Sequence, residues 1–320
     1  MVISHLARHW LARRHYSPVS LLACIARSLR VLLFYREHGR LLALPVYREH
    51  LVQIHDDVFH HLSHRDYLVR GLPLRERVRC VGTHYRFEEA RFDSAYRQAV
   101  YRDGGLVLWR QETAGRLFEI RLALAPRLSA EGDLILAASV DGICLHRLSF
   151  SWTDGVLTGT GAAIVPFIAR NQGHRLDAGA AFSAFELAYP NNSPSFFCFA
   201  ALQGVAGALE MDQVVAVRAA RQCAYSPAQD RHFANAYDGF WRTLGGIETP
   251  QGYRIALPLP LKPLSGMPSR RRKRAALRRE HWRAIGESAR LALLGHLQSV
   301  PAAAMATTRS MIVRPTAHPG

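Results

Sequence analysis

The amino-acid sequence predicts a mixed α/β protein: a helical N-terminal region packs on a mostly antiparallel central sheet, and a basic helix follows. Two observations support this fold class. Apolar residues recur at spacings of three and four in the first part of the chain, and from Gly105 short apolar runs alternate with turn-forming residues. With 320 residues, 49% of them apolar, the chain can bury one large core or two smaller ones.

We expect four regions: a helical region over residues 1–100, an α/β core over 101–262, a basic helix over 263–299 and a disordered tail over 300–320. Two apolar helix faces support the first region. They are Leu51, Ile54, Val58 and Leu62, and, behind Pro73, Leu74, Val78, Val81 and Tyr85.

Four short runs after Gly105 predict an antiparallel meander. They read LVLWRQ, RLFEIRLAL, GDLILAASV and ICLHRLSFSW. Asp141-Gly142 favours a hairpin turn, because both residues tolerate positive φ. The stretch IVPFIARNQG at 164–173 predicts another strand, and its Pro166 favours an edge position or a bulge.

The rest of the core is predicted to alternate helices with short strands. Phe182, Phe185 and Tyr189 mark one helix face, and Ser193-Pro194 begins a second helix that Gly204 and Gly207 would let approach the sheet. The run VVAV at 214–217 is typical of a parallel strand. An aromatic stripe, expected to be core, and the strand YRIALPL follow; the stripe is Phe233, Tyr237, Phe240, Trp241 and Leu244, capped by Gly245-Gly246.

The balance of 41 Lys+Arg against 25 Asp+Glu gives a net charge of +16, nearly all of it from arginine. Anionic partners such as lipid headgroups, nucleic acid or coenzyme phosphates fit this charge, although an arginine-favouring genome would produce the same bias. The densest segment is a candidate for binding an anionic membrane surface, with a solvated helix face as the alternative: Arg270, Arg271, Arg272, Lys273, Arg274, Arg278 and Arg279. No sequence-specific nucleic-acid motif accompanies it.

Five widely spaced cysteines without a C-x-x-C pair favour a reducing compartment. The longest early apolar run, SLLACIARSLRVLLFY, is interrupted by Arg27 and Arg30, so we expect neither a transmembrane segment nor a signal peptide. The expected location is the cytoplasm, with peripheral association with the inner membrane as a further option. The oligomeric state and the substrate stay open.

The order of several motifs resembles the VirK/YbjX-like proteins of proteobacteria over residues 45–297. The motifs are LPLRERVRCVGTHY, EGDLILAASVDGICLHRLSFSW, the strand ending ARNQG, VVAV, NAYDGFWRTLGG and the arginine-rich segment. The resemblance implies links to virulence, envelope stress and tolerance of cationic antimicrobial peptides, without an assigned biochemical activity. Where that family has a G-L-R-P-K-like segment, this chain reads AYPNNSPSFF and lacks its two basic residues.

The same core also resembles the GNAT superfamily of acyl-CoA-dependent N-acyltransferases: a meander, a strand, a glycine-containing turn, helices, a strand and the ending FWRTLGG. That resemblance implies acyl-CoA as cofactor, held at a helix N-terminus that favours an anion. The implied binding residues are Arg170, Asn171, Gln172, Gly173, His174 and Arg175. Arg175 departs from the superfamily pattern by replacing a small residue, and Trp241 by replacing the usual tyrosine acid.

Other candidate sites are weaker. Glu131, at the start of EGDLIL, is a candidate base, with an ordinary turn carboxylate as the alternative. Asp56, His60 and His64 recur every four residues and carry metal-ligating groups, but no further ligand is evident and we expect no established metal site. The sequence lacks the G-x-S-x-G, H-E-x-x-H and P-loop motifs, so it offers no support for those hydrolase or nucleotidase classes.

Overall fold

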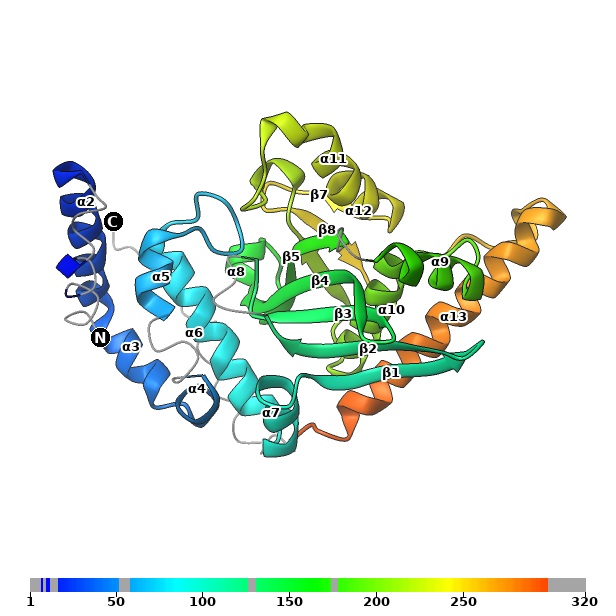
Figure 1. The fold of residues 1–320 in the computed structure, drawn as a ribbon, viewed down its shortest axis with the longest axis horizontal. Helices are drawn as coiled ribbons and strands as arrows, with labels where there is room; N and C mark the ends of the chain where they lie inside the picture. Colours follow the sequence, from blue (N-terminus) through cyan, green and yellow to red (C-terminus); the bar gives the residue numbers. More distant parts are fainter. Residues whose placement is uncertain are drawn as a thin grey trace, which may run out of the picture.

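A computed structural model of the chain contains mixed helices around one mostly antiparallel sheet, as predicted (Figure 1). It describes residues 7, 10–11, 17–51, 58–125, 131–173 and 178–298. The strand order is β1-β2-β3-β4-β5-β6-β8-β7. The strands are β1 (Leu106–Thr113), β2 (Arg116–Leu124), β3 (Leu134–Val140), β4 (Ile143–Asp154), β5 (Ile164–Gly173), β6 (Gln213–Ala216), β7 (Ile247–Glu248) and β8 (Tyr253–Ala256).

The helices lie mainly at the two ends of the sheet and against it (Figure 1). Those before the sheet are α2 (Pro18–Leu29), η2 (Arg30–Phe34), α3 (Tyr35–Leu42), α4 (Pro45–His50), α5 (Val58–His64), α6 (Leu74–Arg91) and α7 (Ser94–Tyr101). Those within and after it are α8 (Gly155–Thr158), α9 (Gly179–Ala188), α10 (Pro194–Ala208), η3 (Ala219–Arg221), η4 (Pro227–Gln229), α11 (Asp230–Ala234), η5 (Asn235–Gly239), α12 (Phe240–Thr243), η6 (Leu264–Gly266) and α13 (Ser269–Leu294).

The predicted meander is confirmed, because β1 to β4 pair antiparallel in chain order. The turn between β3 and β4 has Asp141 at φ 50° and Gly142 at φ 80°. Positive φ at both positions is the geometry of a tight hairpin that matches strand twist. The predicted hairpin turn is therefore confirmed.

The strand β5 lies inside the sheet, so Pro166 does not mark an edge; the alternative, a bulge, is present in β5 three residues later, at Ala169, where the register with β4 shifts. β5 is antiparallel to β4 and parallel to β6. Its parallel pairing begins only at Phe167, opposite Val215, so Pro166 lies outside the part of the strand that pairs with β6. Pairing with β6 is brief, with Ile168 opposite Ala216 as the second and last registered pair.

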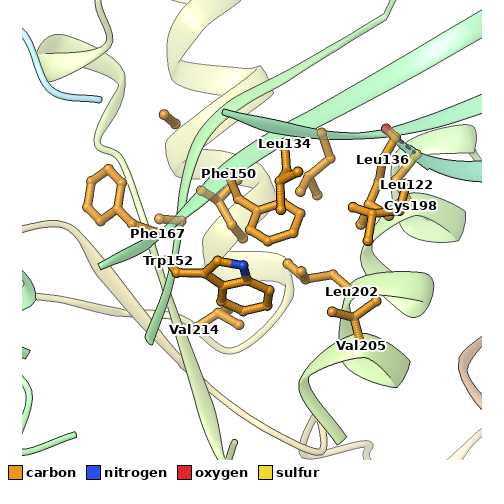
Figure 2. Packing of buried hydrophobic residues seen from close by; sticks show 14 of the residues in the cluster. Leu122, Leu134, Leu136, Phe150, Trp152, Phe167, Cys198, Leu202, Val205 and Val214 are labelled. Carbon is orange, nitrogen blue, oxygen red and sulfur yellow. Dashed lines mark hydrogen bonds between the residues drawn. The ribbon is translucent and has the colours of Figure 1, made fainter. Parts of the chain in front are cut away.

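The helix α10 packs against β3 and β4 and forms the centre of the core. Figure 2 shows Leu202 and Val205 of α10 beside Trp152 and Phe150 of β4, all with 0% exposure. Nearer the N-terminus of α10 the Cys198 thiol donates to the Leu136 carbonyl oxygen at 3.6 Å (Figure 2). The predicted cap is present, since Ser193 Oγ accepts from the Phe196 N–H at 3.5 Å.

Gly204 allows α10 to approach α13, whereas the sequence predicted an approach to the sheet. A Cβ added at Gly204 would lie 2.1 Å from the Gly286 carbonyl oxygen of α13. The two backbones therefore touch, as small residues at helix crossings permit. Ile285, Ala289 and Leu293 of α13 are buried, so the C-terminal half of the basic helix belongs to the core.

The predicted aromatic stripe is core. Phe233, Tyr237, Trp241 and Leu244 are buried from α11 to the residue after α12, Phe240 is half-buried against the same core, and Gly245 ends the segment at φ 80°. The middle of this segment is a single π-helical turn, which the sequence did not predict. Neither was the two-residue edge strand β7.

Candidate functional site

Two of the predicted site residues meet where β5 diverges from β6. Arg170 Nη1 donates to Glu131 Oε2 at 2.6 Å, and the two side chains are only 29% and 12% exposed. Glu131 reaches this position because Gly132 crosses closely over β4, where an added Cβ would lie 2.9 Å from the Phe150 carbonyl oxygen. Gly132 has φ 116°, which glycine adopts without strain.

A buried glutamine fills the space where β5 and β6 diverge. Gln222 has no exposed surface, and its Nε2 donates to Glu131 Oε1 and, at 3.4 Å, to the Ala169 carbonyl oxygen. Its Oε1 accepts from the Ala224 N–H at 2.5 Å. The ion pair and the glutamine thus form one polar cluster, the Glu131–Arg170–Gln222 cluster, at the end of the parallel pair.

Asn171 is committed to a second internal network. Its Oδ1 accepts from His146 Nε2 at 2.8 Å, and its Nδ2 donates to the Ala236 carbonyl oxygen at 2.8 Å. This arrangement assigns the proton to Nε2 of a neutral imidazole. Burial lowers the pKa of His146 to about 4, so the ring is neutral near pH 7.

Of the other predicted coenzyme ligands, Gln172 is half-buried and Gly173 is exposed at the end of β5. Gln172 and Gly173 pair with Arg147 and His146 of β4, while His174 and Arg175 lie outside the described residues. Trp241 is fully buried and donates from Nε1 to the Val217 carbonyl oxygen at 3.0 Å. Acyl-CoA binding at this turn stays a prediction.

The basic segment begins α13 and projects at the end of the molecule away from α2 (Figure 1). Arg271, Arg272, Lys273 and Arg274 are exposed, whereas Arg278 and Arg279 are half-buried, and the Arg270 side chain lies outside the described residues. Trp282, further along the same helix, stacks on Phe196 with ring centroids 5.0 Å apart. The aromatic residue of this segment therefore stabilises packing.

The predicted metal candidates are only partly described. Asp56 and the His60 side chain lie outside the described residues, and His64 Nδ1 lies 2.8 Å from Ser63 Oγ. Within the described part of the chain no three histidine, cysteine or acidic side chains are close enough to hold a metal ion.

Two carboxyl groups, of the buried Glu88 and the half-buried Asp133, tie α6 to the sheet. Glu88 accepts hydrogen bonds from Trp152 Nε1 at 2.5 Å, Tyr101 OH at 2.9 Å and Tyr96 OH at 3.3 Å. Burial raises the pKa of Glu88 to about 7, although these hydrogen bonds act in the opposite direction. Asp133 accepts from Tyr85 OH at 3.0 Å and Ser151 Oγ at 2.6 Å, and also from Tyr67 OH.

A cavity of about 630 Å³, which the sequence analysis did not anticipate, lies between α3, α5 and α6. We call it the arginine cavity, because its lining contains four arginines among apolar residues and two glutamates. The lining comprises Phe34, Glu37, Arg40, Leu41, Ala43, Leu44, Phe59, Arg75, Glu76, Val78, Arg79, Gly82 and Arg86. Its size is typical of small-molecule binding sites.

The charges of the arginine cavity are unevenly paired. Arg79 is held by Asp154 at 2.7 Å and by Glu76 at 3.8 Å. No carboxylate of the described residues forms an ion pair with Arg40, Arg75 or Arg86. Partial burial lowers the pKa of Arg86 and the positive charge of Arg40 lowers it further, while the negative charge of Asp154 acts in the opposite direction. The cavity is therefore electropositive.

Beside this cavity α2, η2 and the first residue of α3 expose large apolar side chains. We call this the N-terminal apolar surface, and it consists of Val19, Leu22, Leu29, Leu32, Leu33 and Tyr35. The stretch Pro18–Leu42 is the one helical stretch of the described residues that is long and apolar enough to cross a membrane, which is weak support for a span. Phe34, between the exposed Leu33 and Tyr35, lines the arginine cavity.

A sequence model of a protein family, described as "Protein of unknown function (DUF535)", matches residues 29–282. No curated protein and no solved structure matches the chain. The matched region contains every residue that lines the arginine cavity and begins at the last residue of α2.

Proposed function

The chain belongs to the DUF535 family, which is the family of the VirK/YbjX-like proteins, and from this premise we propose that it is a peripheral protein that binds anionic membrane surfaces. The proposal places it at the cytoplasmic face of the inner membrane. Such a role suits the envelope-stress, virulence and antimicrobial-peptide links that the VirK/YbjX resemblance implies, because cationic peptides act on the same anionic surface.

The N-terminal apolar surface is the observation that carries this proposal. Val19, Leu22 and Leu33 are 77%, 67% and 77% exposed, within one short helical stretch. Clustered large apolar side chains in water mark an interaction surface. The exposed Arg27, Arg30 and Arg36 are interleaved with them, so the surface combines apolar and positive groups in the manner of interfacial helices.

The same segment suits attachment better than a span. Arg27 and Arg30 interrupt its most apolar part, and an arginine at the centre of a bilayer costs roughly 2.5–3.5 kcal/mol or more. Val31 and Leu41 are buried against the protein, so part of the stretch already has a protein partner. A helix lying along the membrane interface can keep its arginines in water while its exposed apolar side chains enter the membrane.

Cosedimentation tests the proposal. The full chain is mixed with vesicles of phosphatidylcholine alone or of phosphatidylcholine with phosphatidylglycerol, and we expect binding to the anionic vesicles. Combining Leu22→Glu with Leu33→Glu should weaken it at least tenfold, because burial of one leucine is worth ~1.5–3 kcal/mol and 1.4 kcal/mol is tenfold. Leu187→Glu, at an 82% exposed leucine on α9, is the matched control.

The basic start of α13 is the competing surface. Reversing Arg271, Arg272, Arg274 and Arg278 to glutamate removes charge at the other end of the molecule and leaves the N-terminal apolar surface intact. Loss of vesicle binding in this variant, with binding retained in the leucine variant, would place the membrane contact on α13. Attachment through α13 would also be the more sensitive to salt, because it rests on charge.

Acyl transfer is the second candidate function, favoured by the order of the elements. The meander, the β5–α9–α10–β6 crossover and the parallel pair follow one another in the order on which the GNAT resemblance rests. The occupied Glu131–Arg170–Gln222 cluster ranks this candidate below membrane binding. Calorimetric titration with acyl-CoA, with Arg170→Ala as the comparison, tests it, and absence of heat would remove it.

A further inference from the structure

The arginine cavity combines a positive part with an apolar part. Arg40 of α3 and Arg75 and Arg86 of α6 line it, and so do Phe34, Leu41, Leu44, Phe59 and Val78. Among the described residues the lining carries four arginines against Glu37 and Glu76, and an excess of like charge at close range is unfavourable. The lining thus fits a ligand that has both an anionic group and a hydrocarbon portion.

The balance of charge indicates the kind of anion. Arg79 already has Asp154 and Glu76, so Arg40, Arg75 and Arg86 face Glu37 as the one other carboxylate of the lining. A phosphate monoester carries close to two negative charges near pH 7 and accepts several guanidinium hydrogen bonds. It therefore matches the surplus better than a singly charged group.

The position of the cavity indicates where such a ligand comes from. Phe34 lines the cavity, while its neighbours Leu33 and Tyr35 are 77% and 64% exposed on the N-terminal apolar surface. A lipid of the surface to which this segment binds would lie next to the cavity. A free phosphate compound would leave the apolar lining without a partner.

We infer that the arginine cavity binds one phosphate-bearing, single-chain amphiphile, with its phosphate on Arg40 and Arg86 and its acyl chain against Phe34, Leu44 and Phe59. This inference rests on the proposed function, because the membrane surface supplies the ligand. It adds a defined site and a ligand class to a general attraction for anionic vesicles.

Two variants test separately the positive charge and the open volume of the arginine cavity. Arg40→Gln with Arg86→Gln removes positive charge from exposed side chains and should leave the fold intact. Gly82→Leu fills the cavity from α6, because an added Cβ points toward the Arg86 guanidinium, 3.4 Å away, and no lining charge changes. Leucine also favours helix more than glycine does. Arg254→Gln, at an exposed arginine of β8, is the matched control.

The test is isothermal titration calorimetry of the full chain with oleoyl-lysophosphatidic acid below its micelle concentration. Inorganic phosphate and oleoyl-lysophosphatidylcholine are the comparison ligands. We expect one site per chain, with affinity at least about tenfold lower for both comparison ligands and for lysophosphatidic acid in both cavity variants. Arg254→Gln should bind like the unmodified chain.

Three results would overturn the inference: no saturable binding of lysophosphatidic acid, equal binding of inorganic phosphate, or binding that both cavity variants retain. Failure here is distinguishable from failure of the proposed function, because the cavity variants keep the N-terminal apolar surface. Vesicle binding without lysophosphatidic acid binding would reject the cavity site alone. Lysophosphatidic acid binding without vesicle binding would reject membrane attachment. The cavity would then be a site for an amphiphile dispersed in solution.

Discussion

Arg170 Nη1 lies 2.6 Å from Glu131 Oε2, so the arginine predicted to hold a coenzyme phosphate is ion-paired with the carboxylate predicted to act as a base. Gln222 closes the cluster from η3 with a hydrogen bond to the same carboxylate. Any anion binding at Arg170 must compete with Glu131 for the guanidinium. The pair is therefore expected to contribute to stability.

A double-mutant cycle with Arg170→Ala and Glu131→Gln measures that contribution. Because the pair is mostly shielded from water, we expect a coupling energy of about 1–2 kcal/mol, between the values for surface and buried pairs. Urea unfolding of the four proteins gives the number. The exposed pair Arg290–Glu287 on α13 serves as comparison and should couple more weakly, because solvent screens it. Equal coupling in both pairs would contradict the expectation.

The sequence indicated Arg170 and Glu131 as site residues but not that they form an ion pair. Arg170 belongs to a turn motif and Glu131 to a strand start, and their separation of 39 positions conceals that β3, which follows Glu131, and β5 both flank β4. The arginine cavity was missed for a related reason. Arg75, Arg79 and Arg86 recur at helical spacing on α6, but Arg40 comes from another helix, so no local pattern indicates that the four line one cavity.

Gly204 and Gly207 give a matched pair of substitutions on α10. Alanine at Gly204 would place its Cβ 2.1 Å from the Gly286 carbonyl oxygen, so the helices must separate, and we expect a loss of roughly 1–3 kcal/mol or more. Alanine at Gly207 meets only Arg290 Cδ, at 3.8 Å, and should gain up to ~1 kcal/mol through helix propensity. Thermal unfolding of both variants checks the opposite signs.

The fold was more accessible to sequence reasoning than the site, because its signals are local. Strand alternation, the Asp141-Gly142 turn and the Ser193-Pro194 cap each act within a few residues, and each was confirmed. Contacts between residues far apart in the sequence were not predicted. The sequence shows that Gly204 has no side chain and can allow a close approach, but it does not show what approaches. The partner, α13, begins more than sixty positions later.

Asp133 joins three hydroxyl groups from separate parts of the chain, so Asp133→Asn should destabilise the protein. Tyr67 precedes α6, Tyr85 lies within it, and Ser151 belongs to β4. The amide nitrogen of asparagine would face hydroxyl groups that donate to Asp133, so a donor would meet a donor. We expect the free energy of unfolding, measured with urea, to fall by about 1–3 kcal/mol. Tyr85→Phe removes a single donor and should cost less, about 1 kcal/mol. A larger loss for Tyr85→Phe would contradict this account of the network.

Glu88→Gln should remove a pH dependence of stability. The pKa of this carboxyl lies at about 7 in the folded protein against an ordinary value of 4.5, so the folded state binds the proton more tightly. Its contribution to stability is then fullest below pH 4.5, falls as the pH rises toward 7 and is constant above. At 1.4 kcal/mol per pKa unit, the wild type should lose roughly 3 kcal/mol relative to the variant between these limits.

Urea unfolding of the wild type and of Glu88→Gln at pH 4.5, 6 and 8 measures this difference. Glu287→Gln provides the contrast, because its hydrogen bond with Arg290 lowers the pKa of Glu287 and gives a contribution of opposite sign. A difference between wild type and Glu88→Gln that is constant across this range would mean that Glu88 keeps one protonation state throughout. Trp152, Tyr96 and Tyr101 would then hold it as a permanent carboxylate, and their hydrogen bonds would outweigh the burial that raises its pKa.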